Sequence, residues 1–231
     1  MKKILSLLLL AGTICVGTPA YAQATSATTG STTALGVATP WNGDPQHTAL
    51  LIIDMQQDPA KIAPEMTNAV LPNLEKIIAS ARSKEVKIFY IGRAYRLDGS
   101  NVEPYRLNAF KAHPFQVTGT PGADFINSIK PQPQDWIIYK NRADGFMDTY
   151  LNEYLSNLQI KNVIITGIQT PVCVRATAIS AMERNYNVTM ITDATASATP
   201  EVQAANLNDM EVNGIATMST ADFLAKLKKS N

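Results

Sequence analysis

Residues 163–194 have the sequence VIITGIQTPVCVRATAISAMERNYNVTMITDA, which predicts a strand, a tight turn, a helix and a second strand. The run 163–166 is apolar and largely β-branched, as is typical of a strand buried on both faces. Gly167 to Pro171 then interrupt the run, and small apolar residues follow that let a helix pack closely on a sheet. The helix is expected to end at Asn185, and residues 188–191 form the next strand. A unit of this kind predicts a parallel sheet.

Cys173 opens the expected helix of this unit. A thiol at a helix N-terminus lies at the positive end of the macrodipole, which lowers its pKa and favours the thiolate. We therefore interpret Cys173 as a catalytic nucleophile. A lone cysteine is more commonly an inert core residue, and the position directly after a strand and turn is what favours reactivity here.

The first 22 residues have the pattern of a secretory signal peptide. Two lysines precede an apolar run at residues 4–11 that is too short to span a membrane, and Ala20-Tyr21-Ala22 fits a cleavage site. We expect cleavage after Ala22 and a periplasmic or secreted protein; a retained N-terminal anchor is the alternative. Residues 23–40 are rich in Ala, Thr, Ser and Gly and predict a flexible linker, so one folded domain is expected over residues 41–231.

Charge and cysteine content narrow the function classes. Removing the leader takes away two of the 20 basic residues and none of the 19 acidic ones, which leaves 18 against 19, a formal charge of −1. This balance argues against nucleic acid or an anionic membrane as a partner. Cys15 leaves with the leader, so Cys173 is the single cysteine of the mature chain and has no partner for an internal disulfide.

Apolar runs alternate with segments of helical periodicity along the rest of the chain. The expected strands are residues 49–53, 86–91, 136–139, 163–166, 188–191 and 215–218. The expected helices are residues 65–83, 121–129, 149–158, 173–184, 200–210 and a last one capped by Ser219. This alternation predicts the α/β class, with helices on both faces of a mostly parallel sheet. Residues 92–120 show neither period, and a connection this long is usually functional or contains short helices.

Three residues of catalytic type follow strands. Asp54 comes after the first expected strand, Lys140 after the third and Cys173 after the fourth. Because ligands bind at the carboxyl ends of parallel strands, we expect the three at one edge. Taken singly, Asp54 could be a turn cap and Lys140 a solvated lysine, so their joint placement carries the argument. A carboxylate can take the thiol proton and an ammonium can stabilise the anion, which suits covalent hydrolysis of an amide or related acyl group.

The same strand order predicts which backbone amides, histidines and acidic residues lie near this edge. The turn at residues 167–170 and the Cys173 amide offer backbone N–H groups for an oxyanion hole. His47 precedes the first strand and lies away from the edge, so a Cys–His pair is available only through His113. Asp193 follows the next strand, and we expect it to cap a turn rather than take part in chemistry.

Three segments, DMQQD at 54–58, YKNRADGF at 139–146 and the stretch from Gly167 to Ala194, resemble the isochorismatase-like cysteine hydrolases. The resemblance covers the chain from about Ala49 to its C-terminus. It implies a three-layer α/β/α sandwich and a triad of Asp54, Lys140 and Cys173. It also implies a non-proline cis peptide between Ile168 and Gln169, with the Gln169 and Cys173 amides as oxyanion donors, and a pocket lined by Phe146.

The resemblance bears on metal and substrate as well. Nicotinamidases of this family hold a metal with an aspartate and two histidines. Asp58 matches that aspartate, but no histidine occurs between His47 and His113, so we expect no metal and no cofactor. The segment 93–106 resembles a subgroup with unassigned substrates. Its arginines either hold a substrate carboxylate or form ion pairs at the rim: Arg93, Arg96 and Arg106.

The expected function is therefore an exported hydrolase that cleaves a C–N bond of a small molecule through an acyl-thioester. One alternative is vinyl ether hydrolysis of the isochorismatase type, in which the aspartate acts as an acid and the cysteine is dispensable. Another is a small-molecule binding protein on the same fold. The expected partner is a small-molecule substrate, without nucleic acid or membrane, and relatives of this family often pair into homo-oligomers.

Overall fold

The computed structural model describes residues 37–229, so the expected leader and most of the expected linker lie outside the described residues. Six parallel strands form one sheet in the order β3-β2-β1-β4-β5-β6. The strands are β1 (Thr48–Ile53), β2 (Lys87–Arg93), β3 (Trp136–Lys140), β4 (Asn162–Ile168), β5 (Asn187–Ala196) and β6 (Ala216–Met218). The predicted α/β class with a parallel sheet is confirmed.

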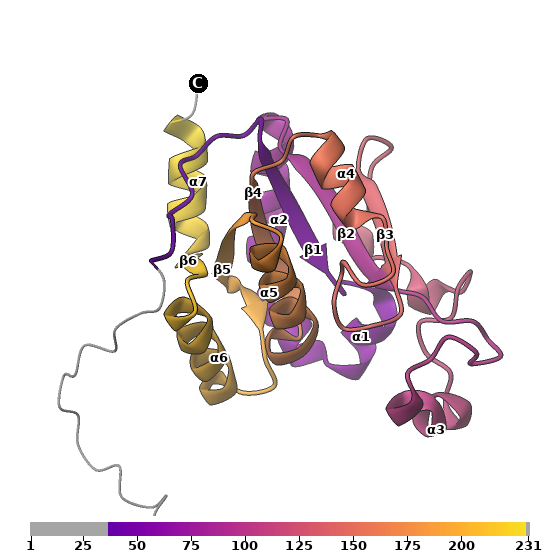
Figure 1. Ribbon diagram of the computed structural model, residues 1–231. Coiled ribbons are helices and arrows are strands. Elements are labelled where there is room, and N and C mark those ends of the chain that lie inside the picture. Colours follow the sequence, from indigo (N-terminus) through magenta and orange to yellow (C-terminus); the bar gives the residue numbers. More distant parts are fainter. Residues whose placement is uncertain (1–36, 230–231) are drawn as a thin grey trace, which may run out of the picture. The chain divides into compact units, whose positions relative to one another are not determined.

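Helices cover both faces of the sheet, which gives the three layers that the sequence predicts (Figure 1). The helices are α1 (Gln57–Ile62), α2 (Pro64–Ser83), α3 (Pro104–Ala112), α4 (Leu151–Asn157), α5 (Arg175–Glu183), α6 (Pro200–Val212) and α7 (Thr220–Lys229). Helices α2 and α7 pack on one face, and α4, α5 and α6 pack on the other. No helix within residues 37–229 combines the length and the apolar character needed to cross a membrane.

The central strand β1 shows why the sheet is buried on both sides. All six of its residues are buried, and their side chains alternate between the two cores. Leu50 and Ile52 point to α2, whereas Leu51 and Ile53 point to the core under α4 and α5. A strand without a polar face can only lie inside such a sandwich.

Two predicted helices differ from the structure. Residues 121–129 form two short 3₁₀ turns, Pro121–Ala123 and Asn127–Ile129, with extended chain between them. The backbone there bonds to the segment after β1 instead, since Ile126 N donates to Met55 O and Phe125 pairs with Gln56. The helix expected to begin at Cys173 begins at Arg175, after a π-helical turn over Thr170–Val174.

The long connection, residues 94–120, has a small core of its own and contains the short helix α3, which agrees with the expectation that so long a connection is functional or contains short helices. Tyr95, Phe110 and Phe115 contact one another edge to face, with ring centroids 5.5–5.7 Å apart. Val102 and Val117 complete this group, which we call the aromatic cluster. The connection therefore folds around its own side chains, beside the end of the sheet rather than on either face (Figure 1).

Candidate active site

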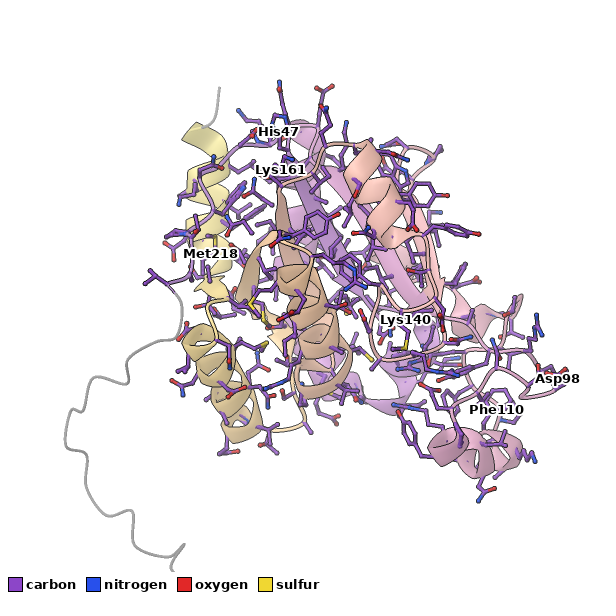
Figure 2. The ribbon with its side chains drawn as sticks, viewed as in Figure 1. His47, Asp98, Phe110, Lys140, Lys161 and Met218 are labelled. Atoms are coloured by element: carbon purple, nitrogen blue, oxygen red, sulfur yellow. The ribbon has the colours of Figure 1, made fainter. Side chains whose placement is uncertain are left out.

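The structure brings Asp54 and Lys140 together at the carboxyl edge of the sheet. Asp54 follows β1, Lys140 ends β3, and Lys140 Nζ lies 3.0 Å from Asp54 Oδ2. Figure 2 shows Lys140 at the opposite end of the sheet from His47 and Lys161, as the sequence predicts for His47. Both charged groups are buried, with 6% of Asp54 and 2% of Lys140 exposed, so each depends on the other for compensation.

The backbone around Asp54 is unusual. Asp54 has φ 55°, in the left-handed region, where a non-glycine residue is uncommon and often functional. Its N–H donates to Ile91 O at 2.8 Å, which fixes it beside β2. The carboxylate oxygen Oδ1 is buried and has no hydrogen-bond partner among the described residues. Asp54 thus has one oxygen held by Lys140 and one free to accept a proton.

Cys173 follows β4 in the turn that precedes α5. The peptide bond between Ile168 and Gln169 is cis, as the resemblance implies. The Gln169 carbonyl accepts hydrogen bonds from the N–H groups of Val172 and Val174, so the turn wraps around that oxygen. Gly167 allows β4 to approach β1 here, because a Cβ at Gly167 would lie 2.1 Å from the Ile53 carbonyl oxygen.

The expectation of a lowered cysteine pKa is wrong in this structure. Burial raises the pKa of the Cys173 thiol, and the nearby Asp54 charge raises it further. Lys140 and Arg93 lower the pKa, but by less. The dipole of a helix end is worth about 1 kcal/mol, whereas burial shifts a pKa by several units. The folded environment therefore favours the protonated form of the Cys173 thiol.

The guanidinium of Arg93 contacts the cysteine directly. Arg93 Nη2 lies 3.2 Å from Cys173 Sγ, while Nη1 donates to Tyr95 Oη at 2.7 Å and pairs with Glu103. The sequence predicts Arg93 as a substrate ligand or rim ion pair, but 2% of it is exposed. The Arg93 guanidinium is therefore buried under the long connection, in contact with the sulfur of Cys173.

The other predicted substrate ligands separate in the structure. Arg106 lines the cavity beside Asp54, whereas Arg96 is exposed to solvent and is not part of that cavity. Phe146 stacks on Tyr186 and lies under the Arg184 guanidinium, so it belongs to the core on the α5 face. Phe146 is therefore not part of the lining of the cavity at Asp54, contrary to what the resemblance implies.

The cavity at Asp54 has a volume of about 80 Å³. Its walls come from α1, the long connection and the turn after β4: Asp54, Pro59, Ile62, Ala63, Arg106, Phe115, Gln116, Ile168 and Gln169. Most of this lining is apolar, with the Asp54 carboxylate and the Arg106 guanidinium as the charged groups.

The residues around Asp58 do not fit the metal that nicotinamidases of this family hold. Asp58 Oδ2 accepts a hydrogen bond from Gln116 N at 2.7 Å. Gly122 packs against the same carboxylate so closely that a Cβ there would lie 2.0 Å from Oδ2. Within residues 37–229 no three His, Cys, Asp or Glu side chains are grouped to hold an ion. Asp58 instead anchors the end of the long connection.

Three further residues of the site are not predicted from the sequence: Gln56, Tyr95 and Glu103. Gln56 is fully buried and uses both ends of its amide, and Glu103 is buried against Arg93. One signal was available for Gln56, which is a polar residue directly after a buried strand at the predicted edge. No comparable signal identifies Tyr95 or Glu103. The expected cap at Asp193 is confirmed, since its Oδ1 accepts hydrogen bonds from the N–H and hydroxyl of Thr220 at the start of α7.

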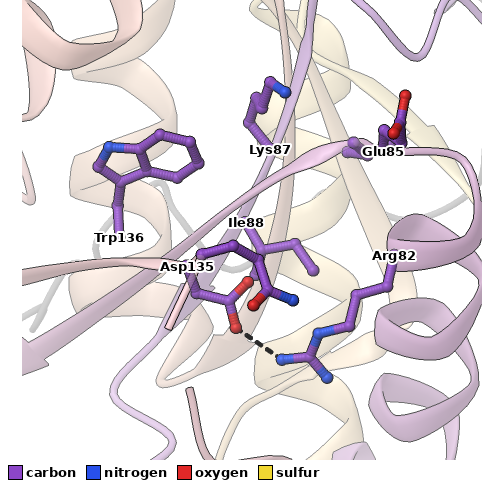
Figure 3. Close-up of a pocket in the computed structure, with 8 residues that line it drawn as sticks. Arg82, Glu85, Lys87, Ile88, Asp135 and Trp136 are labelled. Atoms are coloured by element: carbon purple, nitrogen blue, oxygen red, sulfur yellow. Dashed lines mark hydrogen bonds and ion pairs between the residues drawn. The ribbon is translucent and has the colours of Figure 1, made fainter. Parts of the chain in front are cut away.

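A second cavity, of about 330 Å³, lies at the amino ends of β2 and β3 (Figure 3). Its lining includes Arg82 and Asp135, which pair with each other at 2.6 Å. It therefore lies at the opposite end of these strands from Lys140, which ends β3. Because ligands bind at the carboxyl ends of parallel strands, the smaller cavity at Asp54 is the candidate active site.

Comparisons with known proteins agree with this geometry. The model of the isochorismatase domain matches residues 48–222. A probable inactive nicotinamidase of Arabidopsis thaliana is 32% identical over 190 residues, which cover 79% of this chain and 97% of the relative. The ureidoacrylate amidohydrolase RutB of Pantoea ananatis is 29% identical over 191 residues, 72% of this chain and 76% of the relative. The crystal structure of an isochorismatase family protein from Desulfovibrio vulgaris superposes with a TM-score of 0.74 at 31% identity, covering 80% of this chain and 100% of that one.

Proposed function

The chain belongs to the isochorismatase family of hydrolases, and from that premise we propose an exported cysteine amidohydrolase that cleaves a C–N bond of a small molecule through an acyl-thioester. One observation carries the proposal. A buried carboxylate, Asp54, is held by Lys140 through one oxygen and keeps its other oxygen free, at the edge where Cys173 lies.

Catalysis begins with the protonated thiol. Asp54 takes the Cys173 proton through its free oxygen as the sulfur attacks the substrate carbonyl carbon, and the carbonyl π bond becomes an oxyanion. The tetrahedral intermediate then expels the amine, which takes the proton from Asp54. An acyl-thioester on Cys173 remains. The raised pKa of the thiol supports this order, because the thiol keeps its proton until Asp54 takes it.

Water completes the reaction. The water oxygen attacks the thioester carbonyl while Asp54 takes a proton from that water. The second tetrahedral intermediate then releases the carboxylic acid product. The sulfur leaves as a thiolate and recovers its proton from Asp54. One water is consumed for each C–N bond broken, and the enzyme returns to its starting state. The N–H groups of Gln169 and Cys173 stabilise the oxyanion in both halves, and the Lys140 ammonium pairs with the Asp54 carboxylate.

Arg106 defines the substrate class within this proposal. Its guanidinium is the single cationic group in the lining of the cavity at Asp54. An arginine binds a carboxylate through two parallel hydrogen bonds, so a small amide or ureido compound with an acidic group suits the site. The relative RutB is named for ureidoacrylate, which combines a ureido group with a carboxylate.

The nucleophile is tested with Cys173→Ala and an amide library. We expect the wild type to form a covalent acyl adduct on Cys173, detected by mass spectrometry, and the variant to lose more than about 10⁴-fold in kcat. Two further single variants, Cys173→Ser and Asp54→Asn, distinguish amide hydrolysis from vinyl ether hydrolysis. Retained turnover in the serine variant, with loss in Asp54→Asn, indicates vinyl ether hydrolysis and overturns the thioester. Ligand binding without turnover in the wild type indicates a binding protein.

Export is proposed from the N-terminal pattern alone. Support comes from the two lysines, the apolar run 4–11 and the small residues Ala20 and Ala22. N-terminal sequencing of the periplasmic fraction should begin at Gln23. An intact N-terminus on protein confined to the cytoplasmic fraction would contradict export.

A further inference from the structure

Arg93 ends the strand that lies between the strands of Asp54 and Lys140. It is the last residue of β2, and β2 lies between β1, which precedes Asp54, and β3, which ends in Lys140. Arg93 is the register partner of Lys140 in the sheet. Its guanidinium therefore reaches the carboxyl edge from the same row of backbone that places the Lys140 ammonium.

The side chain of Arg93 is held at both ends of the guanidinium. Nη2 donates toward Cys173 Sγ at 3.2 Å. Nη1 donates to Tyr95 Oη at 2.7 Å and to Glu103 Oε1, and Tyr95 Oη in turn donates to Glu103 Oε2 at 2.6 Å. An arginine fork fixed in this way loses little further freedom when it contacts the sulfur.

The backbone of Arg93 is fixed by a separate group. Gln56 Oε1 accepts a hydrogen bond from Arg93 N at 2.8 Å, and Gln56 Nε2 donates to Arg93 O at 2.8 Å. The same amide also donates to Ala123 O and accepts from Gln116 Nε2. A buried amide with all its bonds in use holds both the strand end and the long connection at a set distance from Cys173.

The charges buried around Cys173 suggest what the contact between Arg93 and the sulfur does. The buried groups are Asp54 and Glu103, which are negative, and Lys140 and Arg93, which are positive. When the Cys173 proton moves to Asp54, the total stays the same, but the negative charge moves from the carboxylate to the sulfur. Lys140 faces the charge at its starting position, and Arg93 faces it at its final position.

We propose that Arg93 is a catalytic residue that stabilises the Cys173 thiolate, with Tyr95, Glu103 and Gln56 as positioning residues. This inference rests on the proposed function, because it assigns a role to Arg93 at the same nucleophile. It also links thiol reactivity to the fold of the long connection, which supplies Tyr95 and Glu103.

The test is the pH dependence of Cys173 alkylation by iodoacetamide in the full chain. The label is quantified on the Cys173 peptide by mass spectrometry, which separates it from Cys15. Arg93→Gln should raise the apparent pKa of the thiol by about one to two units, so that alkylation at neutral pH slows by about 10- to 100-fold. Arg93→Lys keeps the charge and should recover part of the rate. Tyr95→Phe should shift the pKa in the same direction by less.

Arg96→Gln is the matched control, because it removes an exposed arginine three residues away, and its profile should equal that of the wild type. If Arg93→Gln does not fold by circular dichroism, Arg93→Gln with Glu103→Gln removes both buried charges and should show the same shift. An unchanged profile in either folded variant overturns the proposal, as does an equal shift in Arg96→Gln.

This outcome is separate from that of the proposed function. Alkylation reports the sulfur whether or not a substrate is known, whereas turnover in Cys173→Ala tests the nucleophile. Normal turnover in Cys173→Ala would contradict a catalytic role for Cys173 and for Arg93, even if Arg93→Gln shifted the pH profile of alkylation. A shifted profile together with an inactive Cys173→Ala supports both proposals.

Discussion

Two regions of the molecule supply the candidate site, and they hold their side chains by different means. The carboxyl edge of the sheet positions Asp54 and Lys140 through strands whose backbones are bonded along their whole length. The long connection positions Glu103 and Arg106 through the aromatic cluster and a few polar contacts. The first region belongs to the main core, while the second has a core of only a few side chains.

This difference separates chemistry from recognition. Asp54, which would take up the proton, directly follows the fully buried strand β1. The groups that would select a substrate lie on a segment with a small core of its own, and regions with few buried contacts have the lowest local stability. Arg93 lies at the boundary, since β2 fixes its backbone and the long connection fixes its guanidinium.

The largest expected effect compares packing in the two regions. Leu50→Ala removes a fully buried side chain from the main core and should lower the free energy of unfolding of the whole domain by about 2–5 kcal/mol. Phe110→Ala, in the aromatic cluster, should instead raise hydrogen exchange within residues 94–120 and leave β1 and β4 protected. Exchange is measured by mass spectrometry on both variants. Loss of protection throughout the sheet in Phe110→Ala would show that the two regions unfold as one unit.

A smaller effect is expected at Arg106. Arg106→Gln should raise KM for a carboxylate-bearing amide by about 10- to 100-fold, because a hydrogen bond to a charged group contributes about 1.5–3 kcal/mol. The kcat should change little, since this contact forms equally in the ground state and the transition state. The carboxamide analogue of the same substrate is the control and should show no rise. Equal losses for both substrates would remove Arg106 from recognition.

The smallest expected effect is a pH dependence of the free energy of unfolding that comes from Cys173. The pKa of the Cys173 thiol is raised on folding by burial and by Asp54, so the folded chain keeps its proton to higher pH than the unfolded chain. This contribution to stability is complete below the ordinary thiol pKa of about 8.5 and is lost as the pH rises through the folded pKa. Each unit of pKa difference corresponds to about 1.4 kcal/mol. Urea unfolding between pH 7 and 10 should therefore show a steeper decline for the wild type than for Cys173→Ser, and parallel curves would contradict it.

The fold and the meeting of Asp54 with Lys140 follow from the sequence because each depends on short stretches. Runs such as Val163–Thr166 have no polar face, so they must be buried between layers, and parallel strands bring Asp54 and Lys140 to one edge. Gly167 marks the close approach of β4 to β1 in the same local way.

The remaining features depend on contacts between distant segments. Arg93 is buried because of Glu103, ten residues later, and because of Gln56 on another strand end, and neither spacing has a periodic pattern. The helical spacing at residues 121–129 was misleading because hydrogen bonds to the segment after β1 compete with it. The pKa of Cys173 was predicted in the wrong direction because burial, which outweighs the helix dipole, is a property of the whole fold.

The two tryptophans offer a consequence of the layered core. Trp41 is fully buried and stacks on Phe223 of α7, while Trp136 stacks on Phe89 on the face covered by α4 and α5. Each of the two cores thus contains one tryptophan, and the sequence has no third. Replacing either by phenylalanine leaves a tryptophan emission signal that reports the solvent exposure of one face of the sheet alone.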